Sequence, residues 1–461
     1  MECVEVEAVK SQWAIVAPEI ARLFRDLWAC PELPGMEYES VAILTGFLKA
    51  HGFAIEVGIG GVPTAFLARK AGAPGGPRIG ILAEYDALPS LDNAALARRS
   101  GTGRKPGHGC GHNHIGPANC GAAIAAAMAV EALSLPGEIS VIGCPAEEIC
   151  WGKIALQEAG VFDGFDVLLT SHGDYQNASL SRPCHAFVSG EFVFRGDSAH
   201  AGMGVARNAL KTAEDAMSAF LAVMLERFEG INEKHVFRSA GIMPGVMPDE
   251  VRMWCSLRHR DLDPLMVAYR GMAAVFRDVA ARTGVDVEEK FVAACRGYLP
   301  NDVVGRVLDD CLRTVGAPQW SAGDIVFMQE LSQVASPGKP FDLHREIAYF
   351  DDGIDYYGQD DGDASWIVPL GRVNWAYPTG VPIHHWAWTA LSGHAAGDPG
   401  PLMASEALAL GAVHLLRHPE QIAAAKAELA ARVGPQQIKV IPPGINQIMR
   451  DDPMAFWEAR W

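Results

Sequence analysis

Positive charge is scarce in this chain of 461 residues. Its 38 lysines and arginines are outnumbered by 55 aspartates and glutamates, which leaves a formal net charge of −17. Nucleic acids and anionic membrane surfaces bind proteins through clustered cations, so we expect neither as a partner. A small anionic substrate remains compatible with this balance, because a few arginines are enough to form a local positive pocket.

Long apolar runs are missing as well. No stretch is both apolar and uncharged over the roughly 20 residues that a membrane-spanning helix needs. The N-terminal segment lacks the basic, apolar and small-residue regions of a secretory signal. The ten cysteines are irregularly spaced, which favours reduced thiols over a disulfide framework. We therefore expect a cytoplasmic protein.

What the sequence does contain is a glycine-spaced cluster of metal-binding side chains, the run GHGCGHNH from Gly107 to His114. Glycine lets the backbone turn sharply and approach its neighbours closely. Thiols and imidazoles are the ligands that borderline transition metals prefer. If Cys110 and His112 are ligands, the chain is a metalloenzyme. The alternative is that Cys110 is one more small buried residue.

Short apolar runs alternate with helical patterns on both sides of this cluster. Buried strands are predicted over residues 78–83, 139–144 and 167–170, and helices over 11–30, 38–51, 122–133, 404–416 and 420–433. This alternation predicts an α/β domain with a mixed sheet that is covered by helices on both faces. Ligands of such sheets gather at the carboxyl ends of the strands.

The pattern changes between residues 185 and 295. A strand over 186–194 alternates as if half-exposed, and further strands are predicted over 251–257 and 286–293, with helices over 208–228 and 264–283. This block fits a smaller inserted α+β domain. The catalytic domain then comprises residues 1–184 and 296–461.

Further metal-ligand candidates follow the predicted strands. Glu147 and Glu148 come after the second strand, His172 after the third, and His384 stands in a loop before a late helix. Adjacent side chains on extended backbone point to opposite sides. One glutamate can therefore bind a metal while the other serves as a general base. Each residue alone has an ordinary interpretation, as a solvated glutamate or a core histidine, but their recurrence at strand ends favours a metal site.

Together these motifs resemble the aminoacylase/carboxypeptidase-type metallopeptidases, in the amidohydrolase branch that includes the aminobenzoyl-glutamate hydrolases and the indole-acetyl-amino-acid hydrolases. The matching segments keep the family's order over most of the chain: 83–89, 107–113, 145–148, 362–366 and 384–386. The resemblance implies an inserted domain that mediates dimerisation, and hence a homodimer or a higher homo-oligomer.

The resemblance also implies a role for individual residues. Glu147 matches the general base, and the metal-ligand positions match Cys110, His112, Glu148, His172 and His384. The metal is expected to be Mn²⁺ or Zn²⁺, one or two per subunit. His200 resembles a histidine that reaches an active site, often the partner subunit's, where it can stabilise an oxyanion. Residues that flank these motifs are expected to contact the substrate: His114, His385, Trp386 and Arg207.

Two departures from the family pattern concern the substrate. Gly245 stands where the family usually has an asparagine, and the segment after His200 lacks the usual proline. The first hypothesis is hydrolysis of the amide of an N-acyl or aminobenzoyl amino acid. The second is hydrolytic deamination of a small aminoarene such as 5-nitroanthranilate, the substrate of a related aminohydrolase. We expect a small substrate that is aromatic and bears a carboxylate. A third hypothesis is a non-catalytic scaffold, against which the intact Glu147 argues.

Overall fold

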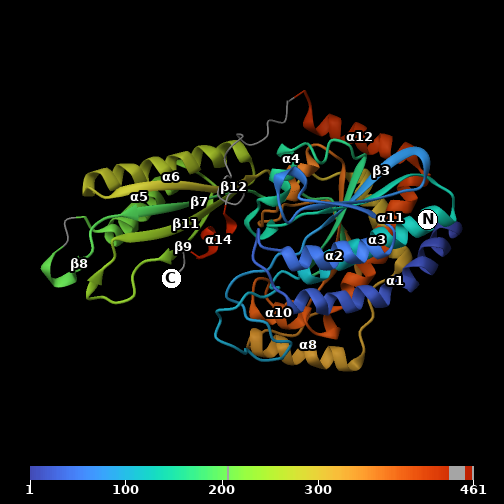
Figure 1. Ribbon diagram of the computed structural model, residues 1–461, viewed down its shortest axis with the longest axis horizontal. Helices are drawn as coiled ribbons and strands as arrows, with labels where there is room; N and C mark the ends of the chain where they lie inside the picture. Colours follow the sequence, from blue (N-terminus) through green and yellow to red (C-terminus); the bar gives the residue numbers. More distant parts are fainter. Residues whose placement is uncertain (205–206, 436–451, 459–461) are drawn as a thin grey trace.

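The computed structural model describes residues 1–204, 207–435 and 452–458, whose strands form two large sheets and one two-stranded sheet (Figure 1). The larger sheet has eight strands in the order β1-β2-β4-β3-β5-β14-β6-β13. Parallel pairs at its centre are joined to antiparallel pairs such as β1–β2 and β14–β6, so the predicted mixed sheet is confirmed. The strands are β1 (Ala54–Val57), β2 (Phe66–Ala71), β3 (Ala73–Ala83), β4 (Pro136–Gly143), β5 (Val167–Asp174), β6 (Asn177–Leu180), β13 (Ile347–Phe350) and β14 (Leu370–Ala376).

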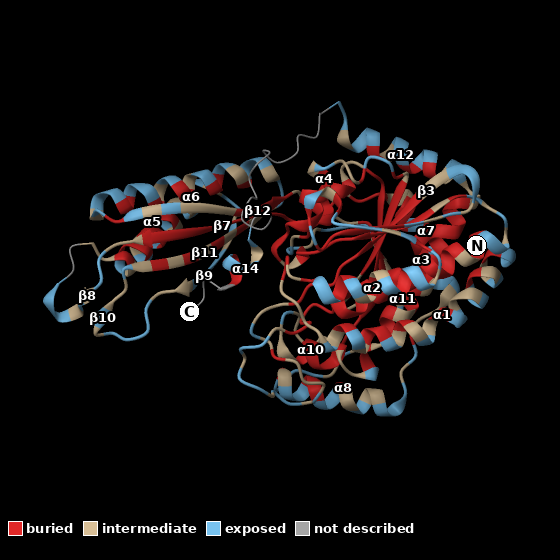
Figure 2. Cartoon of the chain, viewed as in Figure 1, coloured by how far each residue is buried: buried red, intermediate tan, exposed pale blue. Residues whose placement is uncertain are grey.

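Alternate strand residues enter two different cores, one on each face of this sheet. Ile81 and Val141 pack with the long helices on one face, whereas Leu82 and Ile142 pack on the other with shorter elements. Figure 2 shows that the strands of this sheet and the inward faces of the helices around it are largely buried. The first face carries α1 (Cys3–Ala29), α2 (Tyr38–Ala50), α3 (His112–Ala132), α7 (Asp302–Val315), α8 (Ala322–Ala335) and α11 (Pro399–Arg417), and the second carries α4 (Gly152–Glu158) and α9 (Asp361–Ser365).

Helix α3 begins ten residues earlier than the sequence pattern indicates, with His112 as its first residue. Its N-terminal half contains polar residues that interrupt the apolar pattern, but these are buried with partners. The Asn113 amide donates to the carbonyls of Phe24 and Ser392, and the Asn119 amide donates to Leu82. By length and composition α3 alone among the described helices could cross a membrane, yet 83% of its most apolar window is buried inside the protein. Its apolar character is that of a core helix.

The second sheet lies beside the catalytic domain and has the order β12-β7-β11-β9 (Figure 1). Its strands are β7 (Ala186–Arg195), β9 (Asn232–Ser239), β11 (Glu250–His259) and β12 (Asp286–Cys295), and helices α5 (Ala209–Arg227) and α6 (Leu262–Thr283) pack on it. The prediction of a half-exposed strand over 186–194 is wrong, because β7 is a central strand and all nine of these residues are buried. Strand β9 was not predicted, since six of its eight residues are polar or charged and it lies at the sheet edge.

The C-terminal helix α14 (Pro453–Glu458) connects the two sheets' domains (Figure 1). Trp457 is buried and its indole N–H donates to the Pro34 carbonyl at 2.8 Å. Its ring also contacts Trp254 of β11, and the Arg238 guanidinium of β9 lies over it. Arg238 in turn pairs with buried Glu191 at 2.7 Å. One short helix therefore holds residues of the insert against a loop of the catalytic domain.

We expect Trp457→Ala to lower the free energy of unfolding by about 3 kcal/mol, because it leaves a cavity at this junction. Chemical denaturation of both proteins measures the change. Met454→Ala on the same helix is the matched control, since Met454 is 49% exposed and its loss should cost less than about 0.5 kcal/mol. Equal effects of the two substitutions would contradict this role of Trp457.

Candidate metal centre

A cavity of about 600 Å³ lies between the catalytic domain and the insert. The catalytic side of its wall includes Cys110, Glu147, Glu148, His172 and His384, and the insert contributes Phe187, Asn232, Lys234 and Arg258. Five of the six residues that the sequence assigns to the metal ligands and the base thus line one cavity. The sixth, His112, is fully buried immediately behind it.

Two donor groups in this wall share Cys110. One consists of Cys110, His112 and His172, and the other of Cys110, Glu148 and His384. In each group the donor atoms lie within 4.8 Å of one another. Individual separations are 3.4 Å from Cys110 Sγ to His172 Nε2 and 3.3 Å from His384 Nε2 to Glu148 Oε2. Such an arrangement can hold two cations with the thiolate between them.

The backbone that carries these donors is unusually constrained. Six non-glycine residues of the described chain have positive φ, and three of them are donors or lie within two residues of donors: Ala146, Cys150 and His384. Ala146 and Cys150 flank the short 3₁₀ turn η2 (Glu147–Ile149) that presents both glutamates after β4. Backbone strain of this kind concentrates at functional sites.

Close packing explains the glycines around Cys110. A Cβ atom at Gly109 would lie 2.2 Å from a methyl of Leu91 and 3.4 Å from the Cα of His384. The Gly109 carbonyl also accepts from the backbone N–H of His384 at 2.8 Å. The glycine-rich loop therefore brings the first and the last donor of the sequence side by side.

Several buried donor atoms have no hydrogen-bond partner, as expected for a site that binds a cation. These atoms are His112 Nε2, Glu148 Oε1 and Glu84 Oε2. His112 Nε2 lies 3.9 Å from Glu148 Oε1 and 3.7 Å from Glu84 Oε2. Leaving such groups unpaired costs about 1–3 kcal/mol each. A thiol, imidazoles and carboxylates in this geometry fit a divalent transition metal.

Asp86 orients two of the donors. Its Oδ1 lies 2.8 Å from His112 Nδ1, and its Oδ2 accepts from the backbone N–H of Glu148 at 2.9 Å. A carboxylate behind a histidine fixes the ring and directs the other nitrogen at the metal. The role of Asp86 was not predicted, although the polar exit of the strand over 78–83 contains it.

A buried ion-pair network stands behind Glu84. Lys153 Nζ lies 2.7 Å from Glu84 Oε1 and 2.6 Å from Asp360 Oδ1, and all three side chains are fully buried or nearly so. No sequence pattern indicates this network, because its members come from three distant segments. The lysine compensates one carboxylate and leaves the second oxygen of Glu84 facing His112.

Crowded carboxylates dominate the electrostatics. Burial opposes protonation of His112, but Glu148, Asp86 and Glu84 outweigh it and raise its pKa to about 9. Burial and then Glu84 raise the pKa of Glu147 well above its usual range. Partial desolvation at the cavity wall, assisted by His112 and Arg258, lowers the pKa of His384, whose side chain is 54% exposed. An excess of buried negative charge is what a cation would neutralise.

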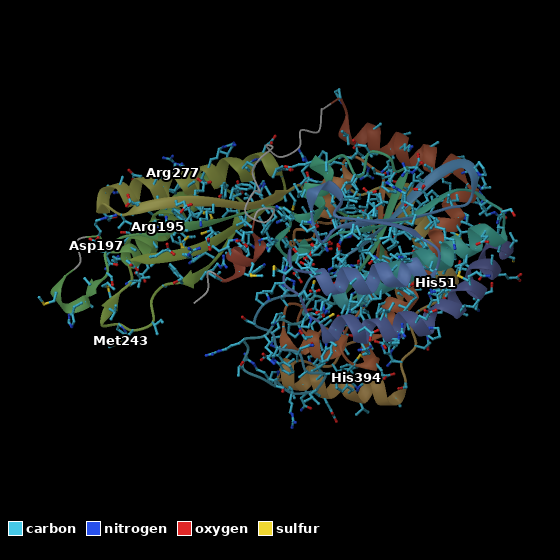
Figure 3. The ribbon with its side chains drawn as sticks, viewed as in Figure 1. His51, Arg195, Asp197, Met243, Arg277 and His394 are labelled. Carbon is cyan, nitrogen blue, oxygen red and sulfur yellow. The ribbon has the colours of Figure 1, made fainter. Side chains whose placement is uncertain are left out.

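His200 and Arg207 lie far from this cavity within the same chain. His200 belongs to the two-residue strand β8 (Ala199–His200), which pairs with β10 (Val246–Met247) and is exposed. Figure 3 labels Asp197 and Met243 in this outer part of the insert. Arg207 pairs with Asp286 at 2.6 Å. Neither residue lines the cavity of its own chain.

The other predicted substrate contacts are not in the cavity wall either. His114 is buried between the Tyr377 hydroxyl at 2.9 Å and Asp398 at 3.4 Å. His385 accepts from the backbone N–H of Ala387 and caps α10 (Trp386–Ser392). Trp386 packs against the main core. Three basic residues do line the cavity, and none of them was predicted: Arg182, Lys234 and Arg258. The last two lie on strands of the insert.

Known proteins of similar sequence and fold are hydrolases. No protein-family model matches the chain. It is 28% identical to one of the subunits of the p-aminobenzoyl-glutamate hydrolase of Escherichia coli (strain K12), over 89% of this chain and 90% of that protein. The crystal structure of an aminobenzoyl-glutamate utilization protein from Klebsiella pneumoniae has a TM-score of 0.61 at 16% identity, covering 88% of this chain and 98% of the other. A dinuclear metal-binding peptidase of the M20 family from Bacillus subtilis has a TM-score of 0.54 at 20% identity, covering 88% and 99%.

Proposed function

We propose that this chain, which is similar in sequence to a p-aminobenzoyl-glutamate hydrolase subunit and similar in fold to an M20-family peptidase, hydrolyses the amide bond of an N-acyl or aminobenzoyl amino acid. The observation that carries the proposal is the pair of donor groups that share Cys110, with Glu147 in the wall of the same cavity. This combination supplies both a cation site and a base.

We assign the metal positions from the two donor groups. Cys110, His112 and His172 hold one ion, and Cys110, Glu148 and His384 hold a second. When bound, a divalent metal here supplies Lewis acidity that activates water and polarises the scissile carbonyl. Zn²⁺ and Mn²⁺ are both candidates, and the thiolate favours zinc.

Glu147 performs the proton transfers. Its carboxylate is 5% exposed, opens to the cavity and lies 3.7 Å from His112 Nε2. From that position it accepts a proton from the attacking water and passes it to the leaving amine. Glu84 and Lys153 position this corner of the site, because their ion pair holds a carboxylate against His112.

The insert binds the substrate carboxylate. Lys234 and Arg258 line the cavity from the neighbouring strands β9 and β11. Arg258 stands opposite Asn232 in the antiparallel pairing of these strands. Neither cation has a carboxylate partner among the described residues, whereas Arg182 in the same wall pairs with Asp355 at 2.6 Å. Lys234 donates to Asn232 Oδ1, and Arg258 lies over the Phe187 ring, so the internal contacts of both cations are uncharged. Cations that face a cavity without a carboxylate partner are suited to an anionic ligand.

Replacing Arg258 with alanine should raise the KM for a carboxylate-bearing amide about 10- to 100-fold, because a hydrogen bond to a charged group is worth roughly 1.5–3 kcal/mol. Steady-state kinetics with the substrate and with its carboxamide analogue measure the effect. The carboxamide should show little change, and the exposed Arg270→Ala variant should behave as wild type. Equal losses on both substrates would contradict carboxylate binding by Arg258.

His200 acts in the cavity of a second copy of the chain, so the functional unit is a homodimer. Two observations support this part of the proposal: His200 is exposed on the insert, and it does not line the cavity of its own chain. We place the enzyme in the cytoplasm, in keeping with its ten free cysteines.

A substrate panel tests the proposed reaction. Metal-loaded protein is incubated with p-aminobenzoyl-glutamate, with an N-acetyl amino acid and with aminobenzoates, including 5-nitroanthranilate. Release of a free amino acid is expected. Ammonia from an aminobenzoate, without amino acid release, would instead support the aminoarene hypothesis. The cavity volume favours the larger amide substrates, since pockets of ~300–1,000 Å³ enclose drug-sized ligands.

A further inference from the structure

A second cluster of metal-binding side chains lies where the start of α1 meets the end of α11. His414 is in the last turn of α11 and His418 follows it, so the two imidazoles are four residues apart. Their ring centroids are 4.3 Å apart. Glu5 of α1 is fully buried against them, with its Oε1 at 2.8 Å from His414 Nδ1. The N-terminus lies at the end of the catalytic domain that is remote from the insert (Figure 1), so this cluster is separate from the cavity.

One nitrogen of this cluster has no hydrogen-bond partner. His418 Nε2 is buried, and its closest carboxylate oxygen, Glu2 Oε1, is 3.8 Å away. The donor atoms of Glu5, His414 and His418 lie within 4.8 Å of one another. Among the described residues, this unpaired buried nitrogen beside a carboxylate and a second imidazole is suited to bind a metal ion.

The remaining contacts prepare the cluster for a divalent cation. His418 Nδ1 lies 3.1 Å from Glu420 Oε1, an arrangement that directs Nε2 inward. Arg417 pairs with Glu2 at 2.7 Å and with Glu5 at 3.3 Å. The backbone N–H of Glu2 donates to Glu5 Oε1 at 2.9 Å, and the side-chain nitrogen of Gln421 lies 3.1 Å from His414 Nε2. Metal binding at Glu5 and His414 therefore replaces some of these contacts. Three carboxylates and one guanidinium leave a net charge of −2 when both imidazoles are neutral. This equals in magnitude the charge of one divalent ion.

We propose that Glu5, His414 and His418 bind a transition-metal ion of the zinc class, with Glu2 as the fourth ligand. Solvent reaches the site through Glu2 and His418, whose side chains are 51% and 24% exposed. Two imidazoles and two carboxylates match the ligand types of tetrahedral zinc sites. The ion joins the first turn of α1 to the end of α11, and its binding therefore stabilises the folded chain.

Zinc counting tests this site independently of catalysis. Chelator-treated wild type, His418→Gln and His51→Gln are dialysed against Zn²⁺ and analysed for bound metal. His51 is the matched control, because it forms a histidine–glutamate pair with Glu19 at 3.4 Å and has no second histidine. We expect His418→Gln to bind one equivalent fewer than the other two proteins and to retain full hydrolytic activity. Equal zinc contents in all three would overturn the proposal.

Cobalt substitution gives a second test that needs no variant. Co²⁺ at the cavity has Cys110 as a ligand and produces a thiolate charge-transfer band, whereas the proposed site has only nitrogen and oxygen donors. Titration of wild type should include one equivalent that adds visible d–d absorption without adding charge transfer. If the charge-transfer band and the d–d bands kept a constant ratio until the last Co²⁺ equivalent was bound, the proposal would be overturned.

Discussion

Glu147→Gln is expected to reduce turnover by about 10²–10⁴-fold while the protein keeps its full metal content. The amide has nearly the shape of the carboxylate but cannot accept a proton from water or return it to the leaving amine. Glu147 forms a third donor group with Glu84 and His112, but it belongs to neither of the two groups that share Cys110, so its replacement leaves both of those groups complete. Kinetics on metal-loaded protein, with metal analysis of the same sample, measures both quantities.

The neighbouring residue provides the matched control. Glu148→Gln removes a carboxylate from the group that contains Cys110 and His384. It should therefore lose bound metal together with activity, in contrast to Glu147→Gln. If Glu147→Gln retained wild-type turnover, or if it lost metal as Glu148→Gln does, the assignment of base and ligand along this turn would be wrong.

Cys110→Ala is expected to have the broadest effect on metal content. Its thiol is the one donor shared by both groups, so its loss should weaken both metal positions at once. Turnover should fall by about 10³-fold, since metal polarisation is worth several kcal/mol and about 1.4 kcal/mol corresponds to a tenfold change in rate. Equilibrium dialysis measures the cavity's metal content.

His172→Ala and His384→Ala distinguish a shared donor from an ordinary one. Each histidine belongs to one of the two groups that contain Cys110, so each variant should lose one equivalent where Cys110→Ala loses two. A Cys110→Ala protein that loses a single equivalent would show that the thiolate serves one ion only.

Much of the metal centre could be predicted from the sequence because its donors sit in short motifs at strand ends. Cys110 and His112 lie two residues apart, and Glu147 and Glu148 are adjacent, so chemical type and local spacing already indicate a site. The parallel strands β3, β4 and β5 then bring these ends together. Their assignment as ligands remains a prediction for the experiments above.

The support of the site could not be predicted, because it is built from distant residues. Lys153 meets Glu84 and Asp360 across 69 and 207 positions of the chain. The same applies to Arg258, whose approach to the cavity depends on how the insert packs. The alternation of apolar and polar residues in β7 predicted a half-exposed strand, but β7 is buried because β11 and β12 flank it on both sides. Local periodicity depends on residues that are close in sequence, so it does not predict contacts between distant segments.

Metal titration of product release tests the central claim most directly. Protein stripped by a chelator is mixed with p-aminobenzoyl-glutamate, and glutamate and p-aminobenzoate are quantified as Zn²⁺ or Mn²⁺ is added. We predict no product without metal, and equal amounts of the two products once the Cys110 groups are filled. Undiminished hydrolysis by the stripped protein, or no amide cleavage at any metal concentration, would contradict a metal-dependent amidohydrolase.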